Sequence, residues 1–293
     1  EAAGVFHAAT KDPDVKMILR GFVRFHREHN PRSGNVKVPF GIDLAVKSKG
    51  CYELGDEMYY GEQDPIRRRV YEKRMFLTMM MGICFLLRCS EHIKSKEGTL
   101  VKPVRRDQLT FFDQDCNRIP YRKVGVVKAT QVTINIPFSK ADQLGLGRKV
   151  SHSRQENRRS ICILCLLEDW IKVTRDSYGA QATTPLYEVS GFRPLKLDHL
   201  TTLMHRTVVE GSEVDPDKVK ATSHSLRYGG ATMLASAGYP QYLIAIYGGW
   251  SRESKSLPIY TKVSEVMVDT VSSHMVAAAE HNPSKRFLMD LLA

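Results

Sequence analysis

Four side chains in the second half of the chain are of the types that could cleave a phosphodiester. His224 and Arg227 stand three residues apart, and Trp250 and then Tyr260 follow them. An arginine presents a planar fork that grips two phosphate oxygens at once, and a phenol can form a covalent intermediate if its neighbours activate it. Any one of the four could be an incidental polar residue on a buried helix. The combination favours attack by a tyrosine on a phosphate.

The balance of charge favours a polyanionic partner. The chain has 43 Lys and Arg against 32 Asp and Glu, a formal net charge of +11. An excess of this size is typical of proteins that bind nucleic acid and, less often, acidic membranes. The longest apolar run, residues 75–87, falls short of the roughly 18 residues that cross a bilayer. We therefore expect a buried helix there and no membrane partner.

Cysteine usage suggests a reducing, intracellular compartment. No signal peptide opens the sequence, which begins at Glu1 without a methionine, so we expect a fragment. Six cysteines, several of them within apolar helical patterns, suit a reducing compartment. Cys162 and Cys165 form a C-x-x-C pair, but a structural zinc site needs four ligands and no second pair is evident. We expect these two cysteines to pack in the core, and we expect no metal and no cofactor.

The elements that must position these residues are mostly helices. Apolar residues at helical spacing predict helices over 14–29, 42–47, 65–87 and 161–173. Three more are predicted from end signals: one capped by Asp198, one capped by Thr222 or Ser223 and ending at Gly238, and one with Pro240 in its first turn. Further helical patterns cover 263–271 and 286–292.

A small sheet is predicted between the two helical halves. Short strands are expected at 109–112, 124–127, 132–136 and 148–150, with a hairpin turn at 145–147. The predicted fold class is therefore α+β and mainly α, with helices around a small antiparallel sheet.

Several motifs resemble those of the tyrosine recombinase (phage integrase) family. The C-terminal signature of that family is similar to His224-Ser225-Leu226-Arg227-Tyr228-Gly229-Gly230, then Tyr247-Gly248-Gly249-Trp250, then Ile259-Tyr260-Thr261. Upstream, Leu86-Leu87-Arg88-Cys89-Ser90-Glu91 resembles the first-arginine motif, and Ser139-Lys140-Ala141-Asp142-Gln143 resembles the hairpin that carries the family's lysine. The Gly-Gly pair and the Ser-Lys-x-Asp-Gln form are similar to eukaryotic mobile elements of the Crypton or DIRS type.

The resemblance assigns a role to each of six residues. Tyr260 would attack phosphorus and form a 3′-phosphotyrosyl bond. Arg88 and Arg227 would stabilise the developing charge without a metal. Lys140 would protonate the departing 5′ oxygen. His224 would hydrogen-bond a phosphate oxygen or accept the tyrosine proton, and Trp250, whose indole N–H cannot accept a proton, would hold and pack.

Each assignment has a structural alternative. Arg88 could simply pair with Glu91, although Glu91 could also hold Arg88 in place for catalysis. Lys140 could be an ordinary surface lysine, with Lys149 and Lys128 as competitors for the role of acid. His224 could be a polar residue at a helix start, Trp250 a core tryptophan, and Tyr260 a tyrosine of an amphipathic helix. Pro258 precedes Tyr260 by two residues, which leaves open whether Tyr260 acts in its own protomer or in a neighbour.

The resemblance also divides the chain into three parts. Residues 1–36 would be the end of a core-binding domain with its linker, and 37–275 the catalytic domain. Residues 276–293 would form a C-terminal helix that docks on a neighbouring protomer, although packing within the same chain is the alternative. Exchange of four strands implies double-stranded DNA and a homo-tetramer on two duplexes as partners. Basic runs at 67–69, 102–106, 118–128 and 148–159 would supply phosphate contacts.

The expected function is site-specific recombination of DNA, for integration or excision of a mobile element. No ATP, divalent ion or other cofactor is implied, because the covalent bond keeps the energy of the phosphodiester. Two alternatives stay open: a domesticated DNA-binding protein that has lost the reaction, and a type IB topoisomerase or telomere resolvase. All six catalytic positions are filled, which favours the recombinase. The expected location is intracellular, and nuclear if the host is a eukaryote.

Overall fold

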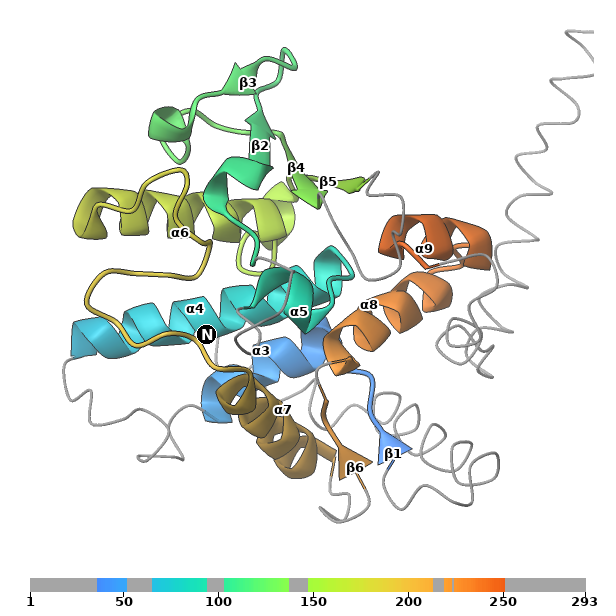
Figure 1. Ribbon diagram of the computed structural model, residues 1–293. Coiled ribbons are helices and arrows are strands. Elements are labelled where there is room, and N and C mark those ends of the chain that lie inside the picture. The colour runs from blue at the N-terminus through green and yellow to red at the C-terminus, as the bar shows by residue number, and fades with distance from the viewer. Residues whose placement is uncertain are drawn as a thin grey trace, which may run out of the picture.

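The computed structural model describes residues 36–51, 65–93, 103–136, 147–212, 219–222 and 224–250. In these ranges helices surround a small antiparallel sheet, which confirms the predicted fold class (Figure 1). Helix α4 (Pro65–Cys84) lies at the centre and contacts α3 (Ile42–Cys51), α6 (Ile163–Tyr178) and α8 (Ser225–Ser236). No helix in the described ranges is long and apolar enough to cross a bilayer.

The four-stranded sheet lies beyond α6 as seen from α4 (Figure 1). Its order is β3 (Arg118–Ile119), β2 (Leu109–Phe112), β4 (Gln131–Ile136) and β5 (Arg148–Ser153), and all neighbours are antiparallel. Burial alternates along β4, where Val132, Ile134 and Ile136 are buried. Alternate residues thus place one face of β4 in the core. The strands predicted at 109–112, 132–136 and 148–150 are confirmed.

The structure also contains a two-stranded sheet that was not predicted from the sequence. β1 (Val36–Lys37) pairs in parallel with β6 (Val219–Lys220), and the Phe40 backbone N–H then donates to the Ser225 carbonyl at 2.9 Å. Two-residue strands are too short to show a hydrophobic period. Their pairing brings the start of the described chain to the beginning of α8.

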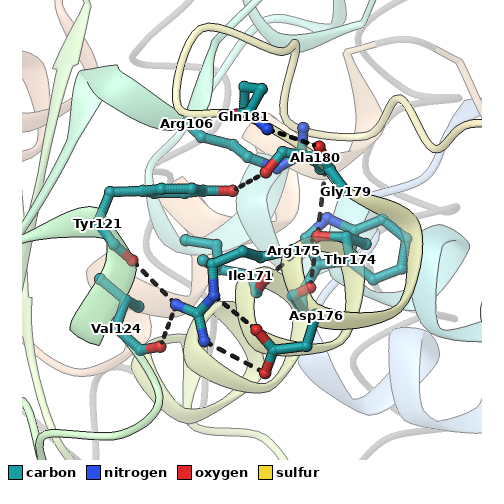
Figure 2. Close-up of polar contacts among 11 residues, drawn as sticks. Arg106, Tyr121, Val124, Ile171, Thr174, Arg175, Asp176, Gly179, Ala180 and Gln181 are labelled. Carbon is teal, nitrogen blue, oxygen red and sulfur yellow. Dashed lines mark hydrogen bonds and ion pairs between the residues drawn. The ribbon is translucent and has the colours of Figure 1, made fainter.

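The predicted strand at 124–127 is wrong, because tertiary contacts bend the backbone there. A 3-10 turn over Tyr121–Lys123 leads into Val124, and Arg175 Nη1 of α6 donates to the carbonyls of Tyr121 and Val124, both at 2.9 Å (Figure 2). Gly125 follows at φ 75°, which turns the chain away from an extended course. Residues 126 and 127 are exposed rather than alternating.

Helix ends also differ from the predictions. The helix predicted over 65–87 ends at Cys84. Asp198 lies in the first turn of α7 (Leu197–Ser212) rather than capping it, and α8 is capped by His224 rather than by Thr222 or Ser223. Pro240 is the N-cap of α9 (Gln241–Gly248) rather than part of its first turn.

Other sequence predictions are confirmed or fall outside the described part. Cys162 and Cys165 are 3% and 1% exposed in the main core, as expected for packing residues. The predicted helices at 14–29, 263–271 and 286–292, and most of the turn at 145–147, lie outside the described residues. The division into 1–36, 37–275 and 276–293 stays a prediction.

The Gly229-Gly230 pair allows α8 to pack directly on neighbouring backbone. A Cβ added at Gly229 would lie 2.2 Å from the Phe40 carbonyl oxygen, and one at Gly230 would lie 2.2 Å from the Ile83 carbonyl oxygen. Any side chain would therefore push α8 away from the end of α4. The motif fixes the distance between the helix that carries Arg227 and the segment that leads to Arg88.

Candidate functional site

A bend after α4 is the point at which the site is assembled. Leu86 adopts a left-handed backbone conformation, with φ at 50°, which costs a non-glycine residue roughly 1–3 kcal/mol. Its side chain is fully buried in a small apolar cluster that includes Ala231 of α8 and Ile244 of α9. Its carbonyl accepts a hydrogen bond from Arg227 Nη1 at 2.8 Å. The contacts of Leu86 with α8 and α9 account for the end of the helix at Cys84.

Arg88 and Glu91 form a reciprocal pair immediately after this bend. Arg88 is the N-cap of α5 (Cys89–His92), and its backbone N–H donates to Glu91 Oε2 at 2.9 Å. Its Nη1 donates to Glu91 Oε1 at 2.8 Å. The Glu91 side chain is 2% exposed and the Arg88 side chain 19% exposed. The ion pair and a positioning role of Glu91 are therefore compatible, because the carboxylate fixes the guanidinium while part of it stays accessible.

Arg148 is a third arginine in the site, and no role in it follows from the sequence. It begins β5, and its Nη2 lies 3.4 Å from Glu91 Oε2 and 3.3 Å from the Leu86 carbonyl oxygen. Its Nη1 donates to the Tyr247 carbonyl at 2.6 Å. A basic residue at the start of a strand looks like a surface residue, yet this side chain is only 13% exposed.

Arg227 is held from two sides. One nitrogen donates to the Leu86 carbonyl, and its Cζ lies 3.7 Å from the centroid of the Trp250 ring. A cation over an indole face is attracted by the ring quadrupole. Gly248 makes this stacking possible, because a Cβ there would lie 1.9 Å from a Trp250 ring carbon. The structure thus places Trp250 against Arg227, in keeping with a holding role.

Three arginines gather around one buried carboxylate. We call Arg88, Arg148 and Arg227 the arginine cluster; the first two pair with Glu91, and all three act on its charge. Burial alone would raise the pKa of Glu91. Arg148, the Arg88 backbone N–H and guanidinium, and Arg227 outweigh burial and hold this pKa below its ordinary value. Glu91 is therefore ionised at neutral pH, and the guanidinium groups around it are of a type that suits a phosphate.

His224 lies one turn before Arg227. It is the exposed N-cap residue of α8, and its backbone N–H donates to Thr222 Oγ1 at 3.3 Å. His224 is thus exposed at the start of the helix that carries Arg227. Lys140, in the connection between β4 and β5, and Tyr260 lie outside the described residues.

The two lysines that compete with Lys140 do not join the cluster. Lys149 is exposed and alternates with Arg148 along β5, so it occupies the opposite face of the strand. Lys128 forms an exposed ion pair with Glu156 at 2.5 Å. Lys140 therefore stays the predicted acid.

The backbone around the cluster is braced by His152 of β5. Its Nε2 lies 2.8 Å from the Cys84 carbonyl oxygen and 2.7 Å from Tyr247 Oη. Burial lowers the pKa of His152, although the hydrogen bond to the Cys84 carbonyl opposes this. Arg148 and His152 lie on the same face of β5, so one strand contacts both the end of α4 and α9.

Not every predicted basic run can reach DNA. Arg106 is 1% exposed and donates to the Pro185 and Glu188 carbonyls, and Arg154 pairs with Glu168. Several other basic residues of the sheet region are exposed, among them Arg118, Arg122, Lys123, Lys149 and Arg158. These side chains form the candidate phosphate-contacting surface.

Other kinds of site are separate from this cluster. A cavity of about 380 Å³ lies beside the end of α6 and is lined by Arg74, Tyr178, Glu188 and Phe192, among others. None of the predicted site residues lines it. Within the described ranges, no three His, Cys, Asp or Glu side chains gather as a metal site would require.

Replacing Glu91 by glutamine should test the charge balance. We expect the free energy of unfolding at pH 7 to fall by about 2 kcal/mol or more, because the arginine cluster loses its carboxylate. The folded pKa of Glu91 is lowered, so its contribution is present above the ordinary value of 4.5 and is lost as pH falls through the folded pKa. Urea unfolding of both proteins from pH 7 to pH 3 should show the difference shrinking in acid.

Glu72→Gln is the matched control, since Glu72 forms a partly exposed i,i+4 pair with Arg68. We expect it to change stability by less than about 1 kcal/mol. A constant difference between wild type and Glu91→Gln over this pH range would contradict the prediction.

Comparison with known proteins gives structural similarity at low sequence identity. No family model and no curated protein matches the chain. The XerH site-specific recombinase bound to its difH substrate, in a pre-cleavage complex, is 16% identical with a TM-score of 0.47, over 82% of this chain and 55% of that chain. A post-cleavage complex of XerH with a palindromic difH substrate is 15% identical with a TM-score of 0.46, over 80% and 52%.

The XerA recombinase is 12% identical with a TM-score of 0.44, over 84% of this chain and 64% of that chain. The chain thus spans less than two thirds of the length of each of these recombinase chains. Similarity at this level assigns no activity to the chain.

Proposed function

We propose that this chain is the catalytic part of a site-specific DNA recombinase that cleaves and rejoins DNA through a 3′-phosphotyrosyl bond. The observation that carries the proposal is the arginine cluster, in which Arg88 and Arg148 contact the Glu91 carboxylate and Arg227 lies close enough to lower its pKa. Guanidinium groups gathered in this way suit the oxygens of a phosphate. A tyrosine, Tyr260, follows the cluster's tryptophan by ten residues in the sequence.

Each step of the proposed reaction has a residue. The phosphate would lie against Arg88 and Arg227, which stabilise the charge that develops at phosphorus. Tyr260 Oη would attack phosphorus, the bond to the 5′ oxygen would break, and Lys140 would supply the proton to that oxygen. Attack by a 5′ hydroxyl from another strand would reverse these steps and release Tyr260.

Two further residues prepare the site. His224 would hydrogen-bond a phosphate oxygen or take the proton of Tyr260, since it is exposed one turn before Arg227. Trp250 would keep the Arg227 guanidinium in its plane, because the ring lies 3.7 Å from its Cζ. Both residues would act only once a phosphate is bound at the arginine cluster.

The proposed reaction also implies an oligomeric state and a DNA partner. Exchange between two duplexes cuts four strands, so we propose a tetramer on double-stranded DNA. Integration or excision of a Crypton- or DIRS-like mobile element is the proposed setting, in the nucleus if the host is a eukaryote. The exposed basic residues of the sheet region would supply phosphate contacts, which give affinity rather than sequence choice.

A suicide duplex provides the test. The substrate would come from the termini of the element that encodes the chain, with a nick that lets the released fragment diffuse away. We expect a protein–DNA species that survives denaturation and forms equally well in EDTA. Binding without any covalent species would favour the inactive DNA-binding alternative, and loss of cleavage in EDTA would indicate a metal-dependent nuclease. Relaxation of supercoiled DNA without joining of two partners would favour the topoisomerase alternative.

A further inference from the structure

We infer that Arg148 is a positioning residue for the proposed reaction, which orients Arg88 by holding the far side of the Glu91 carboxylate. The inference rests on the proposed function. Both Glu91 oxygens accept from Arg88, Oε1 from Nη1 at 2.8 Å and Oε2 from the backbone N–H at 2.9 Å. Oε2 also lies 3.4 Å from Arg148 Nη2, which ties the Arg88–Glu91 pair to a distant part of the chain. Loss of that contact would let the pair shift as a unit, and the Arg88 guanidinium would move with it.

The guanidinium of Arg148 is committed to protein groups. Its two terminal nitrogens contact the carbonyls of Phe85, Leu86 and Tyr247 at 3.4, 3.3 and 2.6 Å, in addition to Glu91. Burial lowers the pKa of Arg148, and the Glu91 carboxylate opposes this effect. The arginine is therefore placed to act through its neighbours rather than on substrate.

These contacts join three separate parts of the chain. Arg148 begins β5, Phe85 and Leu86 form the bend after α4, and Tyr247 belongs to α9. The same Leu86 carbonyl accepts from Arg227 Nη1. One planar side chain thus sets the bend against both phosphate-binding arginines, and a lysine, with a single charged centre, could not reproduce its fork.

The Gly248-Gly249 motif has a second role here. Gly249 ends α9 at φ 67°, and a Cβ added there would lie 2.9 Å from Arg148 Cδ and 3.1 Å from its Nε. Its neighbour Gly248 leaves room for the Trp250 ring that stacks on Arg227. Adjacent glycines therefore make space for two groups of the same site.

Arg175 offers a matched control within the chain. It also donates to two carbonyls, those of Tyr121 and Val124, and to one carboxylate, that of Asp176 (Figure 2). Its side chain is 14% exposed, against 13% for Arg148. Arg175 lies near the C-terminal end of α6, and the three partners just named are not predicted site residues.

The experiment is a double-mutant cycle on the rate of covalent attachment to the suicide duplex at saturating DNA. We expect Arg148→Lys to slow attachment about 10- to 100-fold with DNA affinity changed less than about threefold, since small misplacements of a catalytic group have effects of this size. In a Glu91→Gln background, Arg148→Lys should cost no more than about a further threefold, because both changes release the same guanidinium. Arg175→Lys should leave the rate within about twofold in either background.

The outcomes separate this inference from the proposed function. The positioning role is overturned if Arg148→Lys attaches to DNA as fast as the wild type. It is also overturned if the rate loss in the double variant equals the product of the losses in Arg148→Lys and Glu91→Gln. In both cases the recombinase proposal stands. Stability of each variant, measured by urea unfolding, ensures that rates compare folded proteins. If the wild type itself gives no covalent species, both proposals fall together.

Discussion

Replacing Tyr260 by phenylalanine is expected to abolish covalent attachment of the protein to DNA. The phenol oxygen is the atom that would form the bond to phosphorus, so its removal leaves no nucleophile and the rate should fall below detection. DNA affinity should stay within about twofold of the wild type, because the arginine cluster and the exposed basic residues remain. Denaturing gel electrophoresis of the labelled suicide duplex measures attachment, and a mobility shift measures binding.

Tyr242→Phe is the matched control for this substitution. Tyr242 lies on α9 and is 65% exposed, so loss of its hydroxyl should leave attachment unchanged. Tyr260 lies outside the described residues, and its assignment rests on its distance from Trp250 in the sequence. A persistent covalent adduct in Tyr260→Phe would transfer the role to another of the 12 tyrosines.

The second large effect is expected for Arg227→Lys, which should slow attachment by about 10² to 10³-fold. The Arg227 guanidinium bonds to the Leu86 carbonyl and stacks on Trp250. A lysine ammonium cannot stack as a plane and donate as a fork. The single-turnover rate at saturating DNA is the measurement, with the mobility shift as a check on binding.

Arg106→Lys controls for the loss of a buried guanidinium. Arg106 is 1% exposed and donates to the Pro185 and Glu188 carbonyls, away from the arginine cluster. This variant should lose stability and yet, at a temperature where it is folded, attach DNA at close to the wild-type rate. Equal rate losses in the two variants would show that Arg227 acts through stability alone.

Long periodic elements of the fold could be predicted from the sequence. The helices α3 and α4 and the strands at 109–112 and 132–136 could be predicted from the spacing and length of their apolar runs. The end of α4 could not be predicted: Cys84, Phe85 and Leu86 continue the apolar run with no glycine or proline. The helix ends there because the Leu86 side chain and carbonyl have partners on α8 and α9.

The candidate site also contains residues that the sequence predicts and one that it does not. Arg88, Glu91, Arg227 and Trp250 were predicted from motif spacing, and the structure brings them together around the Leu86 bend, with His224 at the start of α8. Arg148 was expected only as part of a basic strand. Its burial depends on contacts with residues about 60 positions before it and about 100 after it, which no local pattern can reveal.

The end of α4 has one further electrostatic consequence. Aligned peptide units give a helix a macrodipole, with roughly half a negative charge at its C-terminus. Three successive carbonyls at and beyond this end, those of Cys84, Phe85 and Leu86, face His152, Arg148 and Arg227. The backbone thus offsets part of the positive charge of the cluster, so the guanidinium groups are already in place for the phosphate of the proposed reaction.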